Sequence, residues 1–267
     1  MAMFDLLPES TGFKLENALA LALAAELAYE DESRIREVVT GPWGFDGFHF
    51  CDRKDTQGLV MSNDHAVVVA FRGIQSGRRA DWIDNLDLDL AKGPLGGRVN
   101  AAFQKRFAAV WKDIDSAIGG LRAGKAKSLW FTGHGLGAAL ATLAVARLVE
   151  QDRPVYGLYT FGSPRVGDRK FTRNFNFEYR PRAFRLVNHG DTMTRLPPRS
   201  AGYSHVGTFR YFTDEGELVD DMGWWYQFLD RVAGSLDEFR RWGSDGLKNH
   251  DMAQYRQRLE SLSAGGT

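Results

Sequence analysis

The sequence lacks most of the features that mark a specialised class of protein. It has one cysteine, Cys51, which excludes a disulfide within the chain and indicates a reducing compartment. Basic and acidic residues both number 34, so the net charge leaves no electrostatic footprint for nucleic acid or for an acidic lipid surface. The six histidines are not spaced as in a zinc site. We therefore expect no nucleic-acid partner, no metal and no cofactor.

A long hydrophobic run is also missing. The apolar segment Glu16–Glu30 is too short and too interrupted to span a bilayer, and Asp5 and Glu9 precede it where an export signal carries basic residues. We therefore expect an N-terminal helix that packs on the domain, no transmembrane segment and a cytoplasmic protein. Secretion by a route that needs no signal stays open, and the oligomeric state is not indicated.

Strand and helix patterns alternate along the chain. With no repeat, low-complexity tract or long linker, we expect residues 1–267 to form one domain. Short apolar runs predict buried strands, and helical patterns lie between them. The strands are expected at Ala66–Gly73, Lys127–Gly133, Val155–Gly162 and Ala183–Asn188, and the helices at Ala101–Ile118 and Gly135–Glu150. This order predicts an α/β fold whose mostly parallel central sheet has helices on both faces and a ligand site at the carboxyl ends of the strands.

One more absence concerns a single hydroxyl group. The stretch SLWFTGHGLGAALATLAVARLVE, Ser128–Glu150, reads as a strand, a glycine-rich turn and a helix. This is the layout of the G-x-S-x-G elbow, on which α/β-hydrolases present a nucleophilic serine. The middle position here is Gly135. Glycine adopts the strained turn that costs other residues roughly 1–3 kcal/mol, so Gly135 is compatible with the fold and incompatible with acyl-enzyme chemistry. Neither Ser163 nor Cys51 stands out as a substitute.

An acid and a base follow the elbow in the order expected of an α/β-hydrolase. Asp191 comes directly after the predicted strand Ala183–Asn188, and His250 precedes a final predicted helix. The sequence order of position 135, Asp191 and His250 matches nucleophile, acid and base in these enzymes. Each residue also has an ordinary interpretation, because an aspartate after a strand is often a turn or cap residue and a histidine beside polar residues is often a surface cap.

Six sequence blocks in the same order resemble the class 3 lipase family, the α/β-hydrolases that include the filamentous-fungal lipases. The resemblance covers nearly the whole chain. The blocks are Val67–Gly73 (VVVAFRG), Asp81–Leu90 (DWIDNLDLDL), the elbow, Tyr159–Asp168 (YTFGSPRVGD), Phe184–Pro198 (FRLVNHGDTMTRLPP) and Gly202–Gly207 (GYSHVG).

The resemblance assigns roles to particular positions. Asp191 matches the catalytic acid and His250 the catalytic base, while His205 is the competing base and looks structural in this family. The oxyanion hole would use the backbone N–H groups of Leu136 and Ile74. Serine or threonine is common at the second position, so Ile74 keeps the N–H and loses a hydroxyl donor. His134 is expected to pack behind the elbow, and the remaining histidines, His49, His65 and His189, match no catalytic position.

The family has a lid after the oxyanion turn, and this chain has a matching segment around residues 74–90. Trp82, Ile83 and Leu86 would form one apolar face of a helix. That face would meet substrate or a lipid surface if the helix is a lid. An ordinary helix packed on the core would show the same pattern. Trp224 and Trp225, farther along, would line an acyl pocket or belong to the core.

The resemblance implies a carboxylic ester hydrolase, a lipase or esterase acting on acylglycerols or related esters by a Ser-Asp-His mechanism, with a lipid–water interface as one setting. As written, the chain should be almost inactive, because loss of a triad member leaves only residual catalysis. Three explanations remain open: a parent enzyme with serine at position 135, of which this chain is an inactivated form; a natural pseudoenzyme that binds a hydrophobic ligand or a protein partner; and hydrolysis by a water held at His250. The intact acid, base and oxyanion turn favour the first.

Overall fold

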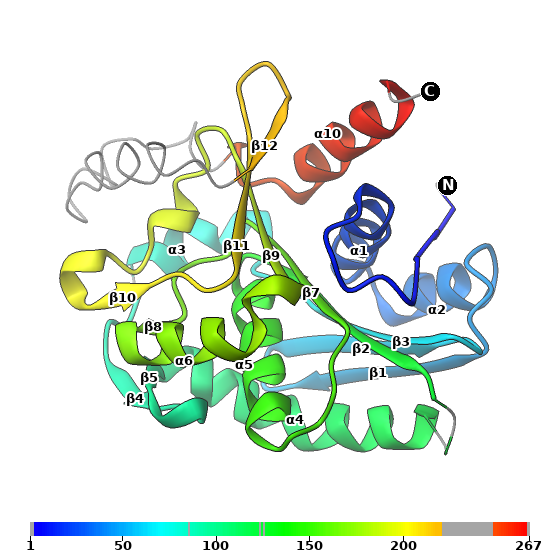
Figure 1. The fold of residues 1–267 in the computed structure, drawn as a ribbon, viewed down its shortest axis with the longest axis horizontal. Helices are drawn as coiled ribbons and strands as arrows, with labels where there is room; N and C mark the ends of the chain where they lie inside the picture. The colour runs from blue at the N-terminus through cyan, green and yellow to red at the C-terminus, as the bar shows by residue number, and fades with distance from the viewer. Residues whose placement is uncertain (1–2, 85, 123, 125, 221–247, 266–267) are drawn as a thin grey trace.

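The structure is a computed structural model that describes residues 3–84, 86–122, 124, 126–220 and 248–265. Its main sheet has eight strands in the order β1-β2-β3-β6-β7-β9-β11-β12 (Figure 1). The strands are β1 Gly47–Arg53, β2 Thr56–Ser62, β3 Ala66–Phe71, β6 Ser128–His134, β7 Gly157–Phe161, β9 Ala183–Asn188, β11 Thr208–Phe212 and β12 Leu218–Asp220. Neighbours from β3 to β11 are parallel, and the pairs at both edges are antiparallel. The predicted mostly parallel α/β sheet is confirmed.

A small antiparallel sheet lies beside the main one, in the order β10-β8-β5-β4. Its strands are β4 Leu90–Lys92, β5 Arg98–Asn100, β8 Gly167–Asp168 and β10 Tyr203–Ser204. Two helices begin directly after strands of this sheet, α4 after β5 and α6 after β8. The small sheet therefore holds together loops that leave the carboxyl ends of the main strands.

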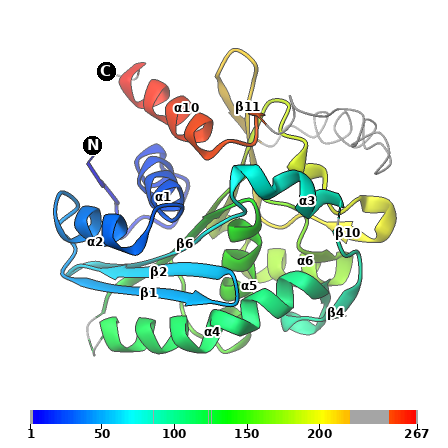
Figure 2. The ribbon, with the colours of Figure 1, turned by 180° about the vertical axis from the view of Figure 1, so that it is seen from behind.

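Helices cover both faces of the main sheet. They are α1 Leu15–Leu27, α2 Glu32–Thr40, α3 Arg79–Asp84, α4 Ala101–Arg122, α5 Leu136–Glu150, α6 Arg169–Tyr179 and α10 Met252–Gly265. Helices α1 and α10 pack side by side on one face, and α4 and α5 pack together on the other (Figures 1 and 2). The first and last described helices thus share one face of the sheet. Among the described residues, no helix has the length and hydropathy needed to cross a membrane.

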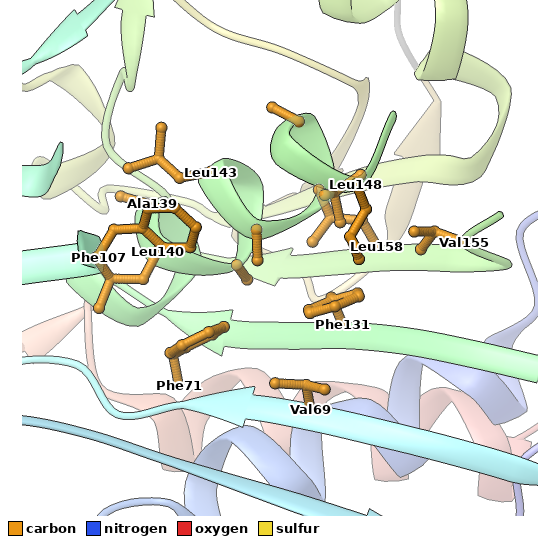
Figure 3. Packing of buried hydrophobic residues seen from close by; sticks show 14 of the residues in the cluster. Val69, Phe71, Phe107, Phe131, Ala139, Leu140, Leu143, Leu148, Val155 and Leu158 are labelled. Atoms are coloured by element: carbon orange, nitrogen blue, oxygen red, sulfur yellow. The ribbon is translucent and has the colours of Figure 1, made fainter. Parts of the chain in front are cut away.

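Strand β3 supplies both cores because its side chains alternate between the two faces. Val67, Val69 and Phe71 belong to the cluster beneath α4 and α5, whereas Val68 and Ala70 belong to the cluster beneath α1 and α10. All five are fully buried. Figure 3 shows Val69 and Phe71 in the first cluster, facing side chains of β6 and α5. Burial on both faces explains why the sequence shows a continuous apolar run here rather than an alternating one.

The predicted strands and helices form. The strands of the main sheet that the sequence did not reveal, β1, β2, β11 and β12, lie at its two edges, and helices α2 and α6 and the small sheet were not predicted either. Strand β1 mixes polar and apolar residues and is mostly half-buried, so its sequence carries no strong strand signal. The N-terminal helix runs over Leu15–Leu27, close to the predicted segment, and α4 continues to Arg122, beyond the predicted end at Ile118. In the 74–90 segment the helical part is shorter than expected: α3 covers six residues after one turn of 3-10 helix.

Two glycines allow α5 to pack tightly against β3 and β6. A Cβ atom at Gly137 would lie 2.1 Å from the backbone oxygen of Phe71, and one at Gly133 would lie 2.4 Å from the backbone of Gly137. Neither site can accept a side chain unless the backbone moves. This close approach brings the N-terminus of α5 to the end of β3, and it therefore fixes where the elbow lies.

We expect Gly137→Ala to lower the free energy of unfolding by about 2–4 kcal/mol, because its methyl group would overlap backbone atoms. Gly119→Ala is the matched control. It lies within α4, where an added Cβ meets no atom within 4 Å, and it should raise stability by about 0.5–1 kcal/mol. Urea unfolding measures both, and equal stability of the two variants would contradict the close-approach account.

Candidate functional site

Gly135 alone forms the turn between β6 and α5. Its φ of 54° and ψ of −119° are a positive-φ conformation that favours glycine. The Gly135 N–H donates to the Phe161 carbonyl at 3.0 Å, and the Gly135 carbonyl accepts from Ala139 at 3.3 Å. The chain thus reverses direction sharply at the carboxyl end of a central strand, as the glycine-rich pattern predicts.

The structure brings Asp191 and His250 together, although 59 residues separate them. Asp191 follows the end of β9, and His250 precedes α10. His250 Nδ1 lies 2.9 Å from Asp191 Oδ2, and the two side chains are 3% and 0% exposed. The other carboxylate oxygen, Oδ1, accepts from the Met193 N–H at 3.0 Å. An ionised, acceptor-only carboxylate makes Nδ1 the donor and leaves Nε2 as the unprotonated nitrogen of neutral His250.

His250 points at the turn, and two glycines make room for it. A Cβ atom at Gly135 would lie 2.8 Å from His250 Nε2. A Cβ atom at Gly162, which also has positive φ, would lie 2.7 Å from the same ring and 2.8 Å from Asp191 Oδ2. The imidazole therefore occupies part of the space that a side chain at position 135 would need, and the pair rests directly on the backbone of Gly162.

Tyr255 is a member of this site that the sequence did not reveal. Its hydroxyl donates to Asp191 Oδ2 at 2.6 Å and accepts from the Asn188 N–H at 3.0 Å. Its ring is buried against Phe161 and Phe212. Burial and the adjacent Asp191 carboxylate raise the pKa of Tyr255 well above its usual value, so it stays a proton donor. The only feature of the sequence that could have pointed to Tyr255 is its position, five residues after His250 and within α10.

His134 lies behind the elbow, as expected from the resemblance. The ring centroids of His134 and His250 are 4.3 Å apart with an interplanar angle of 33°. His134 Nδ1 lies 2.7 Å from the hydroxyl of Tyr29, a second residue that the sequence did not single out. Burial, together with the nearby His250 and Arg79, lowers the pKa of His134 well below its usual value. The ring is therefore neutral at physiological pH.

Three other histidines have side-chain partners elsewhere. His205 Nε2 bonds the Thr194 carbonyl at 2.9 Å, and burial with the neighbouring arginines lowers its pKa well below the usual value. His189 Nδ1 lies 2.9 Å from the Tyr211 hydroxyl, and His49 Nε2 lies 3.0 Å from Asp113. Asp191 is paired with His250 rather than with His205. Within the part of the chain that the structure describes, no group of three or more acidic, histidine or cysteine side chains is placed to hold a metal ion.

Ile74 and Leu136, the two expected oxyanion donors, line one pocket of about 320 Å³. Leu136 is the first residue of α5, where backbone N–H groups have no partner within the helix. Ile74 follows a close contact, since a Cβ atom at Gly73 would lie 2.5 Å from the His134 carbonyl oxygen. The turn after β3 is therefore pressed against the elbow, which brings the two segments to the same cavity.

The segment expected to form a lid packs beside this pocket. Ile83 is 8% exposed and packs with Met193 and Leu196, in the loop that follows Asp191. Leu86 is half-buried, contacts the same cluster and lines the pocket. Trp82 belongs to α3, but its side chain lies outside the described residues. Trp224 and Trp225 lie outside them entirely.

We expect Tyr255→Phe to lower the free energy of unfolding by about 1–3 kcal/mol, because it removes a donor to Asp191 and leaves the buried Asn188 N–H unpaired. Tyr156→Phe is the matched control. Tyr156 is half-buried and makes no side-chain hydrogen bond to a described residue, so its variant should stay within about 0.5 kcal/mol of the original. Urea unfolding distinguishes the two, and an unchanged Tyr255→Phe variant would contradict this role.

Stability should fall as the pH drops from about 6.5 towards 5. The unfolded chain protonates its histidines near pH 6.5, whereas His134 and His205 stay neutral in the fold because burial lowers their pKa values. The unfolded state then binds more protons, and each residue removes up to about 1.4 kcal/mol per pH unit. Urea unfolding at several pH values measures the slope. His205→Gln should reduce it, and the exposed control His65→Gln should not; equal slopes in both would contradict the assignment.

Comparison with solved structures identifies the fold. A triacylglycerol lipase described as having a serine protease triad for its catalytic centre aligns with a TM-score of 0.63 at 24% identity, over 76% of this chain and 82% of that one. A mutant lipase from Penicillium cyclopium aligns with a TM-score of 0.63 at 24% identity, over 78% and 87% of the two chains. At this identity the likeness establishes the α/β-hydrolase fold and nothing finer.

Sequence comparison finds secreted relatives. The secreted mono- and diacylglycerol lipase 1 of Fusarium solani is 34% identical over 61% of this chain and 50% of its own length. The secreted mono- and diacylglycerol lipase A of Penicillium cyclopium is 33% identical over 60% and 52%, and a lipase of Rhizomucor miehei is 29% identical over 60% and 46%. The chain thus spans about half the length of the relatives it matches.

These relatives contradict the expected cytoplasmic location, because two of them are secreted proteins. A single cysteine is a weak guide to compartment, since a domain with an ample hydrophobic core needs no disulfide to fold.

The family assignment rests on a match to a family model. The model described as Lipase (class 3) matches residues 68–201, half of the chain, and this stretch contains the elbow and Asp191. The chain belongs to the class 3 lipase family.

Proposed function

We propose that the chain is a hydrolase of lipid esters whose acid is Asp191 and whose base is His250, with the nucleophile missing at Gly135. The observation that carries this proposal is the direction in which the buried His250 points: its Nε2 lies 2.8 Å from the position of a Cβ atom at residue 135. A histidine paired with a carboxylate through Nδ1, with Nε2 directed at a strand–helix turn, is the arrangement that activates a serine hydroxyl.

In the form with serine at position 135, Nε2 of His250 would take the hydroxyl proton as the oxygen attacks the ester carbonyl. Asp191 would hold the Nδ1–H tautomer and stabilise the imidazolium. The N–H groups of Leu136 and Ile74 would stabilise the oxyanion, and water would then hydrolyse the acyl-enzyme. His250 would protonate the leaving alcohol in the first half of this cycle and activate the water in the second.

The substrates we propose are acylglycerols or related carboxylic esters. The relatives named as mono- and diacylglycerol lipases support this class. The pocket beside Ile74 and Leu136 is lined both by apolar side chains, among them the buried Leu140, and by charged side chains, among them the exposed Arg78 and Asp81. A lining of both kinds suits an amphiphile. We further propose one domain over residues 1–267, with the segment 74–90 acting as a lid over this pocket.

Gly135 favours a second candidate function. Without a hydroxyl at the elbow the chain should hydrolyse esters at a residual rate only, and a natural pseudoenzyme would bind a hydrophobic ligand or a protein partner at the same pocket. A water activated by His250 is a third route. The retained Asp191–His250 pair supports an inactivated hydrolase over a binding protein, because binding alone needs no buried proton acceptor.

The decisive comparison is between the chain as it stands and Gly135→Ser, on short and long p-nitrophenyl esters. We expect the serine variant to gain at least about 10³-fold in kcat/KM, a gain that His250→Ala removes. We also expect it to be less stable by about 1–3 kcal/mol, because position 135 has positive φ and His250 must shift to admit a Cβ atom.

Gly135→Ala is the matched control, since it carries the same Cβ atom and the same backbone strain without a hydroxyl. It should show the loss of stability and no gain in activity. If Gly135→Ser is folded and stays as inactive as Gly135→Ala, the hydrolase proposal is wrong, and saturable binding of a fatty ester by both variants would support the pseudoenzyme instead.

A further inference from the structure

Arg79 is a buried cation at the start of α3, in the segment that follows the oxyanion turn. It is 5% exposed, and its positive charge and a side-chain hydrogen bond to Tyr29 partly offset the rise that burial causes in the pKa of the Tyr29 hydroxyl. Tyr29 lies two residues after the end of α1, well before α3 in the sequence. Burying an arginine costs free energy unless its N–H groups are used, so this contact ties the α3 segment to a specific partner.

The Arg79–Tyr29 contact determines which group donates in the hydrogen bond between Tyr29 and His134. Arginine can only donate, so the Tyr29 oxygen is the acceptor from Arg79. The single proton of the Tyr29 hydroxyl is then directed to His134 Nδ1, 2.7 Å away. His134 must therefore be the neutral tautomer with its proton on Nε2. The fit around the hydroxyl is tight, since a Cβ atom at Gly73 would lie 2.2 Å from the Tyr29 oxygen.

His134 in turn supports His250. The two rings are tilted by 33° with centroids 4.3 Å apart, and His134 is fully buried beneath the proposed base. A second cation here would repel an imidazolium at His250, so catalysis would need His134 to stay neutral. The nearby charge of Arg79 favours the neutral form, because it lowers the pKa of His134 in addition to burial.

We propose that Arg79 is a positioning residue: through Tyr29 it holds His134 in the Nε2–H tautomer, and the His134 ring fixes the orientation of the His250 imidazole. The proposal rests on the proposed role of His250 as the base. It couples the segment that carries Ile74 and the proposed lid helix to the proton-transfer step. Displacing α3 would break the Arg79–Tyr29 hydrogen bond, and the His134 ring that packs against His250 would no longer be held in place.

The first test is imidazole ¹⁵N NMR on the chain with Gly135 in place, which needs no activity. We expect His134 to be Nε2-protonated and neutral at pH 7. Arg79→Met and Tyr29→Phe should each shift His134 towards the Nδ1–H tautomer, and Arg79→Lys, which keeps a donor, should restore it. Arg78→Met is the matched control on the neighbouring exposed arginine and should leave the His134 tautomer unchanged. An Nδ1-protonated His134, or a tautomer that neither Arg79→Met nor Tyr29→Phe changes, would overturn the proposal.

The second test uses the Gly135→Ser background. Arg79→Met should lower kcat on the order of 10-fold with little change in KM, and Arg79→Lys should recover most of the loss. A change in KM alone, or equal losses in both variants, would show that Arg79 shapes the pocket and does not position the base. If Gly135→Ser hydrolyses nothing, the proposed function fails, and the NMR result still decides whether Arg79 controls the His134 tautomer.

Discussion

The hydrogen bond between Asp191 and His250 is the interaction on which the rest of the site depends. It joins a loop after β9 to the turn before α10, and both side chains are buried. A buried carboxylate is costly unless its oxygens are used, and here the Met193 N–H, the Tyr255 hydroxyl and His250 use them. The last helix is thereby fixed to the carboxyl edge of the parallel sheet, the place where α/β folds build their sites.

Glycine defines the shape of this site as much as the polar groups do. Asp191 and His250 can reach the elbow only because Gly162 has no side chain. Likewise, His250 fills part of the space above Gly135 because that residue has no side chain. A side chain at position 135 would therefore require His250 to move, and it would also strain the backbone at that position. The absence of a side chain at position 135 thus changes the geometry of the site as well as its chemistry.

The sequence predicted what local patterns and chain order determine. Short, largely apolar runs located β3 and β9, and the order of elbow, Asp191 and His250 identified the pair that the fold brings together. Tyr29 and Tyr255 were missed, because their roles arise from contacts with His134 and Asp191, 105 and 64 residues away, and no local pattern marks them. Strand β1 was missed because a half-buried strand carries mixed residues. The predicted location was wrong, because it rested on cysteine content and on the charges before Glu16–Glu30, and neither feature determines the compartment.

The most direct test of the central claim, a hydrolase site lacking only its nucleophile, is covalent labelling by a serine-directed alkyl phosphonate, measured by intact-protein mass and peptide mapping. We predict stoichiometric modification at position 135 of the Gly135→Ser variant, strongly slowed by His250→Ala, and no modification of the chain with Gly135. A folded Gly135→Ser variant that is not labelled, or is labelled as fast without His250, would contradict the claim.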